Sequence, residues 1–100
     1  MNPVAYGFAQ KPTPIDTVAV ATRGGGIYCP ALSTISVVIA ATATVNIVSN
    51  PFDDAAKDKI LTTLSATGEY VNASAHVIII DVTATTGNVS ARIVLNSEVD

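Results

Sequence analysis

The sequence predicts an all-β protein, a single antiparallel β-sandwich or small barrel with an extended N-terminal arm and at most one short helical turn. Hydrophobic residues make up 49% of the chain and are mostly Ala, Val and Ile, while Thr and Ser supply most of the polarity. Val, Ile and Thr fit a pleated, half-buried surface. Several runs alternate between apolar and polar residues, and turn signals separate them. The length of 100 residues is that of one domain.

The first 16 residues predict an extended arm, and residues 17–100 the sandwich domain. Three prolines in this segment remove backbone donors and disfavour a core strand. The segment nevertheless carries Val4, Tyr6 and Phe8, and a disordered tail is usually poorer in such residues. We expect the arm either to lie on a neighbouring subunit, through these three residues, or to cover a face of its own domain.

Residues 16–22 predict the first strand, with Val18 and Val20 on one side. The run RGGG at 23–26 predicts a turn, because successive glycines interrupt strands. Residues 27–32 resume an extended path, in which a proline acts as a stop or bulge.

Residues 33–50 show the clearest alternation, with one apolar side and one mixed side. They form either one long strand over 35–47 or two strands joined by a bend near 40–42.

Residues 50–68 fit two patterns. We predict a short helical turn at 52–58 followed by a strand, although four-residue spacing also fits an amphipathic helix ending before Gly68. Residues 69–74 predict a short strand or loop.

Residues 77–95 predict a β-hairpin with its turn at 85–88. This register places Asp81 opposite Arg92 and Ile79 opposite Val94. The face that carries Ile79 and Val94 is polar near the turn and apolar at its far end. We therefore expect the arm, a second sheet or a neighbouring subunit to cover these two residues, which makes them candidate partner-binding residues.

Charge and composition argue against several classes of partner. The formal net charge is −3 and no basic run occurs, which disfavours nucleic-acid binding. The longest apolar runs are far shorter than the roughly 20 residues that cross a bilayer. The start of the chain does not resemble a signal peptide. The single cysteine agrees with this and predicts synthesis in a reducing cytoplasm. Only 13% of the residues are charged, and such an apolar surface predicts assembly with other chains.

We predict no catalytic, cofactor-binding or metal-binding residues. His76 is the one histidine and lacks an evident partner, and Cys29 is the one cysteine, so no internal disulfide can form. The aspartates at 53, 54 and 58 lack the spacing of a calcium loop and fit a capped helical turn. Arg23, beside the glycines, is expected in solvent or on a partner.

The runs TVAVATRGGGIYCPALSTISVVIAATATVNIVSN and LTTLSATGEYVNASAHVIIIDVTATTGNVSARIVL together resemble the small all-β virion proteins of tailed bacteriophages. The insert PFDDAAKDK departs from that pattern. The resemblance implies a non-enzymatic structural protein of the virion, most often a capsid decoration (cement) protein. It implies self-association, with a trimer favoured, and contact with the major capsid protein or other virion proteins. The alternative is a tail- or fibre-associated module that recognises a cell-surface glycan.

Overall fold

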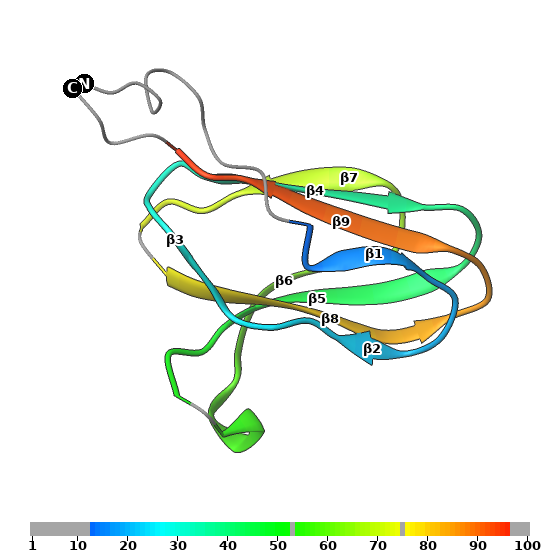
Figure 1. Cartoon of the computed structure of the whole chain (residues 1–100), viewed down its shortest axis with the longest axis horizontal. Helices are drawn as coiled ribbons and strands as arrows, with labels where there is room; N and C mark the ends of the chain where they lie inside the picture. The colour runs from blue at the N-terminus through cyan, green and yellow to red at the C-terminus, as the bar shows by residue number, and fades with distance from the viewer. Residues whose placement is uncertain (1–12, 53, 75, 97–100) are drawn as a thin grey trace.

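The computed structural model describes residues 13–52, 54–74 and 76–96 and confirms an all-β fold in which two antiparallel sheets pack face to face (Figure 1). Sheet A has the strand order β1 (Ile15–Val18), β9 (Val89–Val94), β4 (Thr34–Ile39) and β7 (Gly68–Val71). Sheet B has the order β2 (Thr22–Arg23), β8 (His76–Thr85), β5 (Ala43–Ser49) and β6 (Lys59–Leu64), with β3 (Ile27–Cys29) also pairing with β8.

The core lies between the sheets and follows the alternation in the sequence. Each strand turns every second residue inward, and these residues are almost fully buried, as Ile35 and Val37 of β4 and Ile47 of β5 illustrate. The rest of the buried cluster consists of Ile15, Cys29, Ala43, Val45, Ile78, Ile80, Val82, Val89, Ala91 and Ile93. Ile15 belongs to β1, so the sandwich begins before residue 17.

The long alternating segment is two strands, as the bend near 40–42 predicts. Strand β4 belongs to sheet A and β5 to sheet B, so the bend carries the chain from one sheet to the other. The predicted helical turn is also confirmed, as a 3-10 helix η1 at Ala55–Lys57 that precedes β6. Asp54 caps it by accepting a hydrogen bond from the backbone N–H of Ala56 at 3.0 Å.

The predicted hairpin over 77–95 is wrong. Strand β8 lies in sheet B and β9 in sheet A, so the turn between them crosses the sandwich, and neither pairs with the other. Asp81 is in register with Arg23 and Asn46, and Arg92 is in register with Ser36. Of the residues expected on the apolar face of the hairpin, six are buried, whereas Ala84 is exposed and Leu95 is half-buried. The six buried residues meet across the core because the two strands belong to different sheets, and they are Ile78, Ile80, Val82, Val89, Ala91 and Ile93.

The predicted strand over 16–22 is also wrong, because it is divided between the two sheets. Strand β1 pairs with β9 through an irregular register, with Thr17 at a φ of 55°, and β2 pairs with β8. Val18 packs against the core, whereas Val20, in the crossing between the two strands, is 68% exposed.

Two sheet-crossing turns touch at one end of the sandwich. The backbone N–H of Thr86 donates to the carbonyl of Thr42 at 2.8 Å, and that of Ala40 donates to the carbonyl of Asn88 at 2.9 Å. Between them, a Cβ at Gly87 would lie only 2.8 Å from the Cβ of Ala41. The two turns can therefore approach because residue 87 has no side chain.

We expect Gly87→Ala to lower the free energy of unfolding by about 1–3 kcal/mol, because the added methyl group overpacks this contact. Urea unfolding checks this. The double variant Ala41→Gly/Gly87→Ala should recover part of the loss, and Gly25→Ala, whose Cβ would meet nothing within 4 Å, is the control. A Gly87→Ala variant as stable as that control would contradict the contact.

Candidate functional site

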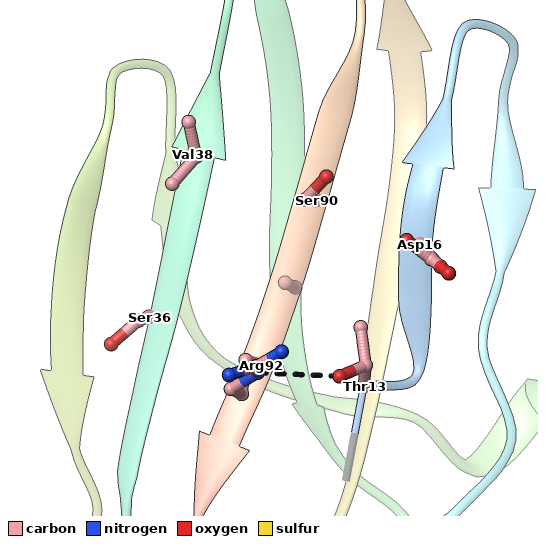
Figure 2. A pocket seen from close by; sticks show the side chains of 7 residues that line it. Thr13, Asp16, Ser36, Val38, Ser90 and Arg92 are labelled. Carbon is pink, nitrogen blue, oxygen red and sulfur yellow. Dashed lines mark hydrogen bonds between the residues drawn. The ribbon is translucent and has the colours of Figure 1, made fainter. Parts of the chain in front are cut away.

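An open groove of about 340 Å³ lies on the outer face of sheet A (Figure 2). Strands β4 and β9 form its floor, and the segment that leads into β1 forms one wall. Seven residues line it, namely Thr13, Asp16, Ser36, Val38, Ser90, Ala91 and Arg92. Their side chains bring together three hydroxyls, two opposite charges and an exposed valine.

Strand register arranges the outer face of sheet A in rows. Residues with odd numbers in β4 are buried, so Thr34, Ser36 and Val38 point outward. Ser36 is in register with Arg92 of β9 on one side and with Glu69 of β7 on the other. The next row toward the start of β4 places Thr34 between Val94 and Val71.

Hydrogen bonds fix several of these side chains. Arg92 Nε donates to Thr13 Oγ1 at 3.3 Å, which ties the start of the described chain to β9 (Figure 2). Ser36 Oγ donates to Glu69 Oε2 at 3.3 Å. The groove is therefore built from side chains of ordered strands, which hold their positions better than loop residues do.

The outer face of sheet B is organised by a network around Arg23. Both of its Nη atoms donate to the Asp58 carboxylate, at 2.7 and 2.8 Å, and Nη1 lies 3.5 Å from Asp81 Oδ2. Asn50 Nδ2 donates to Asp58 Oδ1 at 2.6 Å. Arg23 is exposed, as expected, but its guanidinium pairs with carboxylates of its own chain. The predicted pairing of Asp81 with Arg92 is wrong.

This network raises the pKa of Arg23 and lowers the pKa of Asp58 to about 2, because the paired guanidinium and the Asn50 amide both favour the ionised carboxylate. Arg23 comes from β2 and Asp58 precedes β6, at the two sides of sheet B. The ion pair therefore ties the segment that carries η1 to the far side of its sheet.

Of the predicted partner-binding residues, the structure describes two, Ile79 and Val94, and these lie on different sheets. Val4, Tyr6 and Phe8 lie outside the described residues. Ile79 is on the outer face of sheet B, in register with Val48, and is only 7% exposed. Val94 is half-buried on the outer face of sheet A, in the row beside the groove.

The candidates for chemistry lie near one another at one end of sheet B, since Cys29 is in register with His76. Burial raises the pKa of the Cys29 thiol to about 11, so it stays protonated at neutral pH. His76 contacts two hydroxyls, Ser49 Oγ at 3.0 Å from Nδ1 and Ser74 Oγ at 3.2 Å from Nε2, rather than a carboxylate. Within the described part of the chain, no three His, Cys, Asp or Glu residues are placed to share a metal ion.

Comparison of the chain with protein-family models, with curated proteins and with solved structures gives no match. In the described residues, no helix is long and apolar enough to cross a membrane.

Sequence reasoning missed the role of Glu69 and the pairing of Arg23 with Asp58. The alternation in 33–50 does place Ser36 and Val38 on the side opposite the core, so part of the groove was open to prediction. The pairing partner of Arg23 is 35 positions away, and no local pattern connects two residues at that distance.

The Asp58→Asn variant should lose the acid-dependent part of its stability. Pairing lowers the folded-state pKa of Asp58 from 3.8 to about 2, so the unfolded chain binds this proton more tightly. The stabilisation is therefore present above about pH 4 and is lost as the pH falls toward 2. Urea unfolding at several pH values checks this, with Asp16→Asn on the other sheet as the control. Equal pH slopes for wild type and Asp58→Asn would contradict the assignment.

Proposed function

We propose that the protein is a non-enzymatic structural protein of a bacteriophage virion that decorates the capsid as a homo-oligomer and stabilises it by adhesion. The observation that carries the proposal is the amount of apolar side chain that the sandwich leaves in solvent. Among the residues that the structure describes, seven large hydrophobic ones are between 50 and 68% exposed, namely Val20, Tyr28, Leu32, Val38, Phe52, Ile60 and Val71.

These residues are spread over both outer faces of the sandwich and three of the connections between its strands. Val38 and Val71 lie on sheet A, while Tyr28, in register with half-buried Val77, and Ile60, in register with Val48, lie on sheet B. A protein that must contact copies of itself and a shell at once needs more than one such surface. Apolar contact area removed from water contributes about 25 cal/mol per Å² before the costs of association.

The turn that leads into β4 adds a second argument. Ser33 N–H donates to the carbonyl of Pro30 at 3.2 Å, which closes a turn in which Leu32 has a φ of 69°. Glycine or asparagine is preferred at such a position, because a left-handed backbone is strained for other residues. A leucine that is both strained and 64% exposed stabilises the isolated domain little, which favours a role in contact with a partner.

The resemblance of the sequence to phage virion proteins supports the major capsid protein or another virion protein as that partner. The apolar arm residues Val4, Tyr6 and Phe8 would add to the contact. A specific observation also favours the alternative, a glycan-binding module of a tail or fibre, because Tyr28 and Phe52 are each 58% exposed. One face of Phe52 already carries the ammonium of Lys57, 5.6 Å from the ring centroid, so that ring is a weaker platform for a sugar.

We expect the protein to occur in purified particles of its source at a fixed ratio to the major capsid protein, as quantitative mass spectrometry would measure. A decoration protein occupies equivalent sites over the whole shell, which sets this ratio. A few copies per particle would favour the tail or fibre alternative, and absence from particles would refute both.

We expect Leu32→Asn to fold at least as stably as wild type and to bind particles less well. Asparagine tolerates the left-handed backbone, which costs other residues about 1–2 kcal/mol, but it removes the exposed apolar side chain. Thermal unfolding and a particle co-sedimentation assay measure the two effects separately. Ala66→Asn, which introduces the same side chain at an exposed residue outside this set of seven, is the control. Lower stability with unchanged particle binding would contradict the role of Leu32.

A further inference from the structure

No residue that the structure describes covers the centre of the outer face of sheet A. Strand β4 has a neighbour on each side, β9 and β7, yet Val38 in this strand is 57% exposed. Val71 on β7 is 50% exposed. Apolar side chains in the middle of a four-stranded sheet are normally packed against another layer.

On the same face, Arg92 and Glu69 carry opposite charges and flank Ser36 in a single row, with strand β4 between them. Glu69 accepts a hydrogen bond from Ser36, whereas Arg92 donates to Thr13 on the side away from Glu69. Asp16, the other charged residue that lines the groove, lies on β1 beyond Arg92. In the described chain, both ion pairs belong to Arg23 on the other sheet.

We propose that two copies of the chain pack through the outer faces of sheet A, about a two-fold axis that runs along β4. Such an axis exchanges the two sides of β4, so β9 of one copy lies over β7 of the other. The proposal gives a symmetry and a surface to the self-association in the proposed function, and it does not depend on where the protein is located.

This arrangement pairs the opposite charges of the row at two symmetry-related sites. Arg92 then lies against the partner's Glu69, and Glu69 against the partner's Arg92. The row beside it places Val94 over the partner's Val71, and the reciprocal pair forms on the other side of the axis. Val38, on the axis strand, meets the same residue of the partner. A surface that matches itself in this way is the defining property of a two-fold interface.

The arrangement of residues on this face also favours a two-fold contact over a three-fold one. A three-fold contact joins two different surfaces, and it would leave the alternation of Arg92, Ser36 and Glu69 without a mirrored counterpart. Two sheets in aligned packing cross at about 30°, which a small tilt of the axis from β4 accommodates. A face of four short strands is at the low end of interface sizes, so we expect a dimer that dissociates in the micromolar range.

Sedimentation velocity of the full chain over a range of concentrations tests the proposal. We expect a monomer–dimer equilibrium for wild type. Arg92→Glu and Glu69→Arg should each weaken the dimer at least tenfold, because each places like charges together at both sites. An equimolar mixture of these two variants should restore dimers. One variant then carries glutamate at both positions 69 and 92 and the other carries arginine at both, so opposite charges meet at both sites. Lys59→Glu, the same charge change as Arg92→Glu but on the edge of sheet B, should leave the equilibrium unchanged.

The mixture separates loss of the contact from loss of folding, because a misfolded variant cannot be rescued by the other. A wild-type chain that stays monomeric, a trimer, or single variants that dimerise like wild type would each overturn the two-fold proposal. So would a mixture that fails to form dimers although both variants give a wild-type thermal transition. Particle abundance is measured independently, so either proposal can fail while the other stands.

Discussion

The structure depends on one constraint, which is that two sheets must bury their apolar sides against each other while the chain passes repeatedly between them. The connections from β1 to β2, β3 to β4, β4 to β5, β6 to β7, β7 to β8 and β8 to β9 all cross the sandwich. Consecutive strands therefore face each other across the core more often than they share hydrogen bonds. The close contact at Gly87 follows from this pattern, since two crossings must fit side by side at one end.

This constraint explains what could be predicted from the sequence. Alternation identifies the buried side of a strand, so the inward residues of β4, β5, β8 and β9 and the bend at 40–42 were predictable. Alternation does not say which sheet a strand joins. Ile80 and Ile93 are buried whether their strands pair in one sheet or oppose each other in two, so the hairpin and the sandwich crossing satisfy the same pattern. The pairing of Asp81 with Arg92 was an error of that kind.

The two outer faces differ in how far the chain covers them. On sheet B, the ion pair of Arg23 with Asp58 crosses the sheet. On the same face, Val48 and Ile79 are only 1% and 7% exposed. On sheet A, Val38 and Val71 stay in solvent and the polar side chains are arranged in register around Ser36. Strand register thus places the surface that we propose for association on sheet A, where no described segment covers Val38. Glu69 could not be assigned to that surface from its local sequence, because its role comes from pairing with β4.

The pairing of β1 with β9 joins nearly opposite ends of the described chain, since Ile15 is in register with Ala91. Strand β9 also lies between β1 and β4, so these two strands cannot join one sheet until β9 is present. During synthesis, the ribosome must release the chain through β9 before this sheet can close. Such distant pairings slow folding, because a long loop has to be ordered before any contact rewards it. Until β9 emerges, the apolar sides of β1 and β4 in the nascent chain lack the strand that joins them, and they remain open to contact with other molecules.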